Sequence, residues 1–377
     1  MKIAVDVRLL ERPMTGMGRY LSNLLRYLPE VDPANEYILV SYRPLAVPIP
    51  GTKNVATSGA PRNRLLQKLF SPFWLNFILP RVLKREKIDV FFAPNNLLPV
   101  RNTCTKNIVT IADVFPLVDT RFHPWWHRAY VSFVMSHSLG SADLVLTISE
   151  SSKRDIVRLL RVPEEKVCVT YLAAEECFMP REISSGEQQR LRQKYDLPEK
   201  FVLYIGVVEE RKNIKGIIEI ADFLAPKTDT AIVVVGRVGH GGEPYVEAIK
   251  KRKNMHYSGF VDERDMPYLY NLATAFLFPS FYEGFGLPPL EAMQSGTPVV
   301  ASNRSSLPEV IGDAGITLDP ENSSAFADAL LRIITNDAER ASWVAKGIVQ
   351  AKKFSYRTTA ELTARAIRLA LEHHKNL

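Results

Sequence analysis

The sequence predicts an α/β protein built from two doubly wound domains, each with its own parallel sheet. The chain has 377 residues, which is long enough for two domains of ordinary size. Short apolar runs alternate with helical patterns in two successive series, and most of the runs lack the polar–apolar alternation of a half-exposed strand. A polar break that contains proline and glycine separates the two series.

The apolar runs give the expected strands. The first series predicts strands at residues 3–7, 37–42, 90–93, 107–111, 144–148 and 166–171. The second series predicts strands at residues 201–206, 231–236, 255–258, 275–278 and 298–301. Because strands of this kind are buried on both faces, we expect helices on both faces of each sheet.

The break at residues 179–187 is the expected interdomain linker, because it is polar and holds proline, serine and glycine. We therefore expect a first domain over residues 1–180 and a second over 181–355. Residues 356–377 form a helical pattern, which either packs back across the first domain or ends the second as an ordinary helix. In domains of this kind, ligands bind at the carboxyl ends of the strands. We therefore expect the ligand site in the cleft between the two domains.

The composition is that of a globular protein, with 46% apolar and 24% charged residues. A net charge of +7 on this length does not indicate nucleic acid as a partner, but it is compatible with anionic substrates or an anionic membrane face. There is no signal-peptide pattern and no apolar run of membrane-spanning length. The three cysteines, Cys104, Cys168 and Cys177, are scattered, which suits a reducing compartment. The expected location is therefore the cytoplasm, including the inner face of the membrane.

Two adjacent cations follow the first strand of the second series. Arg211 and Lys212 stand in the loop after residues 201–206, and Asn213 is a suitable N-cap for the helix that follows. Cations beside a helix N-terminus form an anion site, because the helix dipole and the free amides add to their charge. Taken alone, the same residues would also suit a solvated basic turn.

A loop rich in glycine and aromatic residues follows the strand expected at 275–278. Gly284 and Gly286 allow close approach of a ligand to the backbone, and two prolines open the next helix. The amides of Gly286 and Leu287 would point toward an anion. Glu283 and Glu291 flank this turn, and carboxylates beside a phosphate site need hydroxyl partners. A nucleotide sugar offers both groups, whereas a plain helix-capping turn would not explain the composition of the loop.

These two segments resemble the family 4 glycosyltransferases, which have the GT-B fold and retain the anomeric configuration. The family's E-x7-E signature matches Glu283 to Glu291, and its G-x4-R-K-N loop matches Gly206 to Asn213. Further similar segments are Met14–Tyr20, Ser141–Glu150 and Ser258–Val261. The resemblance covers nearly the whole chain and implies two Rossmann-like domains that face each other across a cleft. The first, residues 1–180, would bind the acceptor, and the second, residues 181–355, would bind the nucleotide-sugar donor.

The resemblance also implies roles for individual residues. Lys212 and Arg211 would hold the donor diphosphate, Glu283 would meet hydroxyls of the transferred sugar, and Glu291 would meet the ribose. The full expected donor-binding set is Gly16, Gly18, Arg211, Lys212, Phe260, Val261, Glu283, Gly284, Phe285, Gly286, Leu287 and Glu291. The expected catalytic residues are Asp113, Lys212 and Glu283. No metal and no cofactor are expected, because cations and helix amides take the place of a metal at the diphosphate.

The first domain departs from the family pattern at one position. Relatives often carry a T-I-H-D run after a first-domain strand, and here the histidine is replaced by Ala112. Asp113 remains and would orient the acceptor hydroxyl or act as a base, unless it only caps a loop. His123 follows ten residues later; a surface or packing role is expected for it and no catalytic one.

The expected function is therefore that of a retaining hexosyltransferase. The form of residues 283–291 resembles bacterial mannosyltransferases of polysaccharide assembly, which favours mannose from GDP-mannose; UDP-glucose, UDP-galactose and deoxysugar donors stay open. The expected acceptor is a saccharide or a lipid-linked saccharide of cell-surface polysaccharide or lipopolysaccharide synthesis. Aromatic residues lie between basic ones at 61–87 and 125–128, which suits peripheral membrane contact as well as helix cores.

Two other functions fit the same fold. One is a nucleotide-sugar epimerase or a phosphorylase-like enzyme, although Ala112 removes an acid–base group and no cofactor lysine motif is evident. The other is a protein that binds nucleotide sugars without activity. Ala112 favours such a loss, whereas the intact Arg211–Lys212 and Glu283/Glu291 pairs argue against it.

Overall fold

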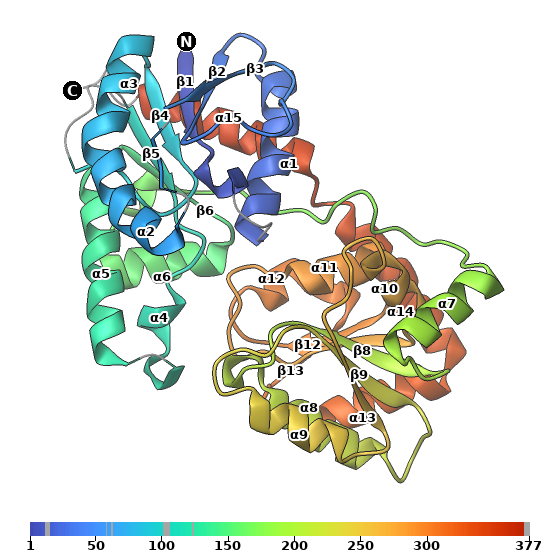
Figure 1. Cartoon of the computed structure of the whole chain (residues 1–377). Helices are drawn as coiled ribbons and strands as arrows, with labels where there is room; N and C mark the ends of the chain where they lie inside the picture. The colour runs from blue at the N-terminus through green and yellow to red at the C-terminus, as the bar shows by residue number, and fades with distance from the viewer. Residues whose placement is uncertain (12–15, 58, 62, 101–105, 123, 373–377) are drawn as a thin grey trace. The chain divides into compact units, whose positions relative to one another are not determined.

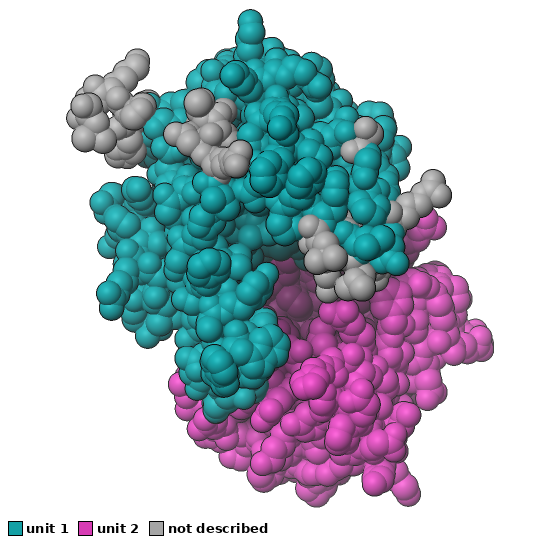
Figure 2. Space-filling view, turned by 60° about the vertical axis from the view of Figure 1, so that its left-hand side comes forward, with its two compact units in different colours: residues 1–172, 356–377 teal, residues 173–355 magenta. Residues whose placement is uncertain are grey.

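A computed structural model describes the chain except for residues 12–15, 58, 62, 101–105, 123 and 373–377. The chain forms two compact units, which Figure 2 shows in different colours. Unit 1 consists of Met1–Leu172 together with Tyr356–Leu377, and unit 2 consists of Ala173–Ser355. The first unit is therefore made from both ends of the chain. The second is one continuous segment.

Unit 1 contains a seven-stranded sheet in the order β3-β2-β1-β4-β5-β6-β7, and all pairs are parallel. Its strands are β1 (Lys2–Asp6), β2 (Glu36–Ser41), β3 (Thr52–Ala56), β4 (Val90–Ala93), β5 (Lys106–Thr110), β6 (Leu144–Thr147) and β7 (Val167–Val169). The central strands β1, β4, β5 and β6 are almost wholly buried, as expected for apolar runs covered on both faces.

Helices flank this sheet. The α-helices of unit 1 are α1 (Gly16–Val31), α2 (Arg64–Phe73), α3 (Leu79–Glu86), α4 (Phe115–Val118), α5 (Trp125–Gly140), α6 (Glu150–Leu160) and α15 (Tyr356–Glu372). A π-helical stretch, Trp74–Ile78, joins α2 to α3. Figure 1 shows α15 beside α1, and α15 also contacts β5 and β6. The last helix of the chain therefore belongs to unit 1, where it covers part of one face of the sheet.

Unit 2 contains a six-stranded parallel sheet in the order β10-β9-β8-β11-β12-β13. Its strands are β8 (Phe201–Ile205), β9 (Ala231–Val235), β10 (Met255–Gly259), β11 (Ala275–Phe278), β12 (Val299–Ser302) and β13 (Ile316–Leu318). Its α-helices are α7 (Ser185–Tyr195), α8 (Ile214–Leu224), α9 (Glu243–Lys250), α10 (Met266–Leu272), α11 (Leu287–Gln294), α12 (Leu307–Ile311), α13 (Ser323–Thr335) and α14 (Asp337–Ala351). In Figure 1 α8, α9 and α13 lie on one face of this sheet, and α10, α11 and α12 lie on the other.

Every strand expected from an apolar run is present, with ends that differ by at most a few residues. The sequence did not predict β3 and β13, which are the outermost strands of their sheets. Neither carries a long apolar run: β3 is mostly polar and exposed, and β13 has only three residues. The boundary between the units follows Leu172 and not residue 180, where the sequence placed it. The last residues of the expected linker lie inside α7, whose N-cap is Ser184.

No helix in the described part of the chain is both long and apolar enough to cross a bilayer. Within the same residues, no three His, Cys, Asp or Glu side chains gather so that they could hold a metal ion.

Candidate active site

The expected donor residues of unit 2 lie at the point where the strand order of its sheet reverses. From β8 the chain continues to β9 on one side, and from β11 it continues to β12 on the other. The crevice outside the carboxyl ends of two such strands is where open parallel sheets bind their ligands. The loops after β8 and β11 meet there, and the amide of Phe281 donates to the carbonyl of Arg211 at 3.1 Å.

Lys212 is the central cation of this crevice. Its Nζ lies 2.5 Å from Oε1 of Glu283 and 5.4 Å from the centre of the Phe278 ring. Only 9% of the residue is exposed. Burial lowers the pKa of Lys212, and the neighbouring Glu283 opposes this shift. A lysine placed here presents a point charge in surroundings where water screens it little, which strengthens its attraction for an anion.

Arg211 is held by the protein on both sides. Its Nε and Nη2 donate to Oε1 of Glu209 at 3.1 and 2.8 Å, and its Nη1 donates to the carbonyl of Tyr282 at 2.9 Å. Its Nη1 also lies 3.8 Å from Oε2 of Glu283. These contacts tie the loop after β8 to the loop after β11. Arg211 therefore positions these two loops relative to each other. Its expected contact with a diphosphate stays a prediction.

Asn213 begins α8, as the sequence predicted. It has a left-handed backbone with φ of 57°, and its Oδ1 accepts from the amide of Gly216 at 3.1 Å. Its Nδ2 donates to the carbonyls of Pro279 and Pro320 at 3.2 and 2.7 Å. One buried side chain therefore caps α8 and fixes the start of the loop after β11, so that the positive end of the helix and Lys212 keep a set position.

The loop that carries Glu283 is pinned by two serines. Ser305 Oγ accepts from the amide of Glu283 at 2.9 Å, and Ser306 Oγ donates toward the carbonyls of Glu283 and Phe285 at 2.9 and 2.7 Å. Gly286 then turns into α11 with φ of 111°, and a Cβ there would lie 2.8 Å from the Leu307 side chain. This left-handed backbone favours glycine at the position, and a side chain there would also have to displace the Leu307 methyl group.

Glu291 lies in α11, where Oε2 accepts from the hydroxyl of Tyr270 at 2.8 Å. Of the two expected residues in the loop after β10, 74% of Phe260 is exposed, whereas Val261 is buried. Phe260 therefore offers its ring at the surface. The expected contacts of these residues with ribose and nucleobase stay predictions.

The expected residues of unit 1 lie at the carboxyl edge of its own sheet. Gly16 is the first residue of α1, and Gly18 is buried in its first turn; Met14 and Thr15 lie outside the described residues, as does His123. Asp113 Oδ1 accepts from the amide of Phe115 at 3.0 Å, which forms an Asx turn around Val114, the N-cap of α4. This is the local loop contact that the sequence allowed for Asp113, and its role toward an acceptor stays a prediction.

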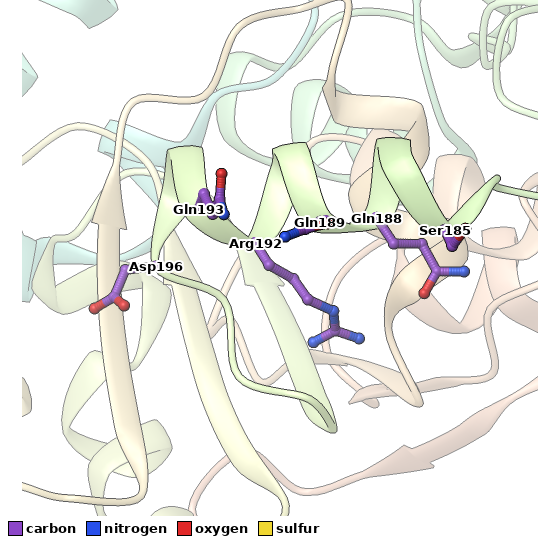
Figure 3. Close-up of a pocket in the computed structure, with 6 residues that line it drawn as sticks. All are labelled: Ser185, Gln188, Gln189, Arg192, Gln193 and Asp196. Atoms are coloured by element: carbon purple, nitrogen blue, oxygen red, sulfur yellow. The ribbon is translucent and has the colours of Figure 1, made fainter.

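The sequence did not point to Glu209, Ser305 or Ser306, which hold the loops of the unit 2 crevice. A carboxylate two residues before Arg211 was a usable signal, whereas the serines are ordinary in sequence and act through contacts from a distant loop. A separate shallow hollow on α7 carries polar side chains from Ser185 to Asp196 (Figure 3). Its Arg192 donates to the carbonyls of Pro198 and Glu199, and no expected donor residue lines it.

Comparison with known proteins agrees with this geometry. Residues 187–350 match the family described as glycosyl transferases group 1, and residues 14–174 match the family described as glycosyltransferase family 4. The chain is 34% identical to O-antigen chain mannosyltransferase B of Escherichia coli over 98% of this chain and 100% of that protein.

Solved structures show the same fold at low identity. A sucrose-phosphate synthase from Thermosynechococcus elongatus superimposes with a TM-score of 0.76, 17% identity and coverage of 99% of both chains. HepE from Anabaena, in complex with UDP and glucose, gives a TM-score of 0.73 and 17% identity over 98% of this chain and 99% of that one. With two parallel-sheet units, the switch-point crevice of unit 2 and a relative that matches over its full length, the chain belongs to the family 4 glycosyltransferases and is a hexosyltransferase with the GT-B fold.

Proposed function

We propose that this enzyme transfers a mannosyl residue from GDP-mannose, with retention of configuration, to a saccharide or lipid-linked saccharide during O-antigen synthesis. The observation that carries the donor half is the buried Lys212 beside Glu283 at the switch point of unit 2. The name of the E. coli relative supports mannose and O-antigen. The complex of HepE with UDP and glucose supports a nucleotide-linked hexose as the class of donor.

Lys212 suits the charge that develops in such a reaction. When the anomeric bond breaks, negative charge grows on the diphosphate oxygen that leaves. A preorganised cation in a poorly solvated site stabilises that charge without having to reorganise. Arg211 and the start of α8 add positive charge near the same point. We therefore expect no metal requirement, since these groups do the work that a metal does elsewhere.

Retention is assigned to attack from the face that the diphosphate leaves, with the departing phosphate accepting the proton of the acceptor hydroxyl. This route needs no strong base from the protein. It accommodates Ala112 in place of histidine and an Asp113 whose carboxylate accepts from the amide of Phe115. Glu283, close to Lys212, would hold hydroxyls of the transferred sugar while the bond breaks.

A nucleotide panel tests the donor assignment. GDP should raise the melting temperature, while UDP, dTDP and ADP should raise it much less. When a ligand is present at 100 times its Kd, the free energy of unfolding rises by about 2.7 kcal/mol. GDP-mannose with acceptor should then give an α-linked product by NMR, at the same rate in EDTA as in Mg²⁺. A preference for UDP would overturn the assignment of GDP, and a β-linked product would overturn retention.

The rival functions give different results in the same assay. An epimerase would change the sugar of the donor with no acceptor present, and the product would stay attached to the nucleotide. A protein that only binds nucleotide sugars would show the thermal shift without any turnover. Either outcome would replace the transferase proposal, whereas transfer to an acceptor excludes both.

We also propose that unit 1 docks on an anionic membrane surface. Helix α5 buries Met135 on its inner side, yet it exposes the rings of Trp125, Trp126, Tyr130 and Phe133, with 77% of Trp125 accessible. We call these four residues the α5 aromatic face; the helix runs along the edge of unit 1 in Figure 1. Tryptophan and tyrosine favour the membrane–water interface, where the ring is apolar and its polar group stays wet.

A second apolar pair lies where α2 meets the π-helical stretch. Phe73 and Phe77 stack with ring centres 5.2 Å apart, and both are exposed. The guanidinium of Arg81 donates to the carbonyl of Phe77 at 2.6 Å, and Arg85 stands exposed one turn later. Cations beside exposed aromatic rings suit anionic headgroups, each adding about 1 kcal/mol near a charged surface.

Vesicle co-sedimentation tests the docking surface. The enzyme should be retained on vesicles with phosphatidylglycerol at low salt, less so at high salt, and little on phosphatidylcholine alone. Replacing Trp125 and Trp126 by serine should release it, whereas Phe223→Ser, which removes an exposed ring of unit 2, should not. Equal retention of the double variant and the wild type would count against the α5 aromatic face.

A further inference from the structure

A buried polar cluster lies at the switch point of the unit 1 sheet, between β1 and β4. From β1 the chain continues to β2 on one side, and from β4 it continues to β5 on the other. Asp6 ends β1, and Asn95 and Asn96 directly follow β4. These side chains therefore occupy, in unit 1, the kind of place that ligands occupy in open parallel sheets.

Asp6 and Arg8 form the base of this cluster. The Asp6 carboxylate is fully buried, and Arg8 donates to it through Nε at 2.9 Å and through Nη2 at 2.6 Å. The guanidinium stacks 4.2 Å from the centre of the Trp74 ring, and its Nη1 donates to Tyr42 and Ser71 at 2.9 and 3.0 Å. The Asp6–Arg8 pair is therefore held in place and carries no net charge. The remaining side of the guanidinium faces Tyr42, Ser71 and Trp74.

Asp6 also sets the orientation of the Asn95 amide. The Nδ2 of Asn95 donates to Oδ2 of Asp6 at 2.8 Å, and a carboxylate can only accept, so the nitrogen must face it. Oδ1 of Asn95 then faces away from Asp6. This oxygen is buried, and in the described part of the chain it has no hydrogen-bond donor.

Asn96 supplies a second oxygen of the same kind. Its backbone is left-handed with φ of 64°, and its amide donates to the carbonyl of Thr110 at the end of β5 at 3.2 Å. Its Oδ1 is also buried and lacks a donor among the described residues. Nearly all buried polar atoms are hydrogen-bonded, so these two adjacent oxygens, which lack a donor among the described residues, are acceptors that a hydroxyl group can satisfy.

We infer that Asn95 and Asn96 bind hydroxyl groups of the acceptor saccharide, with Asp6 and Arg8 as positioning residues. The inference rests on the proposed function. Two carbonyl oxygens above a neutral ion pair attract hydroxyl donors and repel phosphate, which separates this site from the donor site of unit 2. Asp113 follows the adjacent strand β5, so an acceptor held here would have a carboxylate at the neighbouring strand end.

The same loop leads from this site to the apolar surface of unit 1. The amide of Leu98 donates to Oγ of Ser138 on α5 at 3.2 Å, and the amide of Val100 donates to Oδ1 of Asn76 at 2.7 Å. Val100 is exposed, and its partner Asn76 lies in the π-helical stretch, next to Phe77. Residues 95–100 therefore connect the polar site to the aromatic surface. This arrangement suits an acceptor with a saccharide at one end and a lipid at the other.

Kinetics of asparagine variants test the site. Asn95→Ala and Asn96→Ala should each raise the acceptor KM about fivefold, as loss of a neutral hydrogen bond does, while the donor KM stays unchanged. Asn54→Ala is the matched control: it is a unit 1 asparagine whose amide bonds within the protein on the edge strand, and neither KM should change. An unchanged acceptor KM, or an equal rise of the donor KM, would overturn the inference.

A binding measurement separates this inference from the proposed function. Octyl glycosides of mannose, glucose, galactose and N-acetylglucosamine serve as probes in saturation-transfer NMR, which needs no turnover. At least one should bind the wild type, with contacts to its ring protons that are lost in the Asn95→Ala, Asn96→Ala double variant of unchanged melting temperature. Binding without any transfer would refute the proposed function alone. If GDP binds and no glycoside does, the acceptor site is refuted alone.

Discussion

Lys212→Ala should lower kcat by about a hundredfold or more, with a far smaller effect on the amount of folded enzyme. The removal of one preorganised donor aimed at a developing negative charge costs about 2.7–4 kcal/mol of transition-state stabilisation. Lys212 is nearly enclosed, so water replaces its charge poorly, and Arg211 is occupied by Glu209 and the carbonyl of Tyr282. Steady-state kinetics with GDP-mannose at saturating acceptor give the measurement.

Lys215→Ala is the matched control for this experiment. Lys215 is three positions further along, in the first turn of α8, and its side chain is 79% exposed in a pair with Glu219. Its loss should leave kcat within about twofold, since a solvated surface pair contributes little. Near-normal turnover in the Lys212 variant, or an equal loss in both variants, would remove Lys212 from the catalytic assignment.

Arg8→Ala should strongly destabilise unit 1. It leaves the Asp6 carboxylate buried with only Asn95 and local amides as partners, and removing one member of a buried pair costs about 3–5 kcal/mol. It also removes the guanidinium from Trp74, Tyr42 and Ser71. Calorimetry gives the measurement, because two units of different stability need not unfold in one transition.

Arg357→Ala provides the comparison for that loss. Arg357 pairs with Glu30 at 3.0 Å within the same unit, and both side chains are 55% exposed. Exposed pairs of this kind contribute about 0–1 kcal/mol. The transition of unit 1 should therefore move clearly more in the Arg8 variant than in the Arg357 variant. Similar shifts would mean that the Asp6–Arg8 pair is solvated or replaceable.

The central strands and the caps near the donor site could be predicted from the sequence, because they depend on local chemistry. A run such as residues 231–235 is apolar throughout, which only a strand covered on both faces tolerates. Asn213 could be predicted as an N-cap because the cap bonds within three residues. The outer strands β3 and β13 carry too little apolar surface for the same argument, since their positions depend on the neighbours that they pair with.

The polar cluster of unit 1 could not be predicted, because its contacts join residues far apart in the chain. Asn95 and Asp6 are brought together by the pairing of β1 with β4. A usable signal was present in the charges at the end of an apolar run, Asp6 and Arg8, which burial would allow only as a pair.

The origin of unit 1 from both ends of the chain has a consequence for synthesis on the ribosome. Residues 173–355 of unit 2 are contiguous, so that unit can complete its sheet while the rest is still being translated. Unit 1 lacks α15 until the end, and this helix buries Ala360, Ala364 and Ile367. The larger sheet therefore lacks part of its apolar covering until α15 is made, and exposed apolar surface of this kind is what chaperones bind on nascent chains.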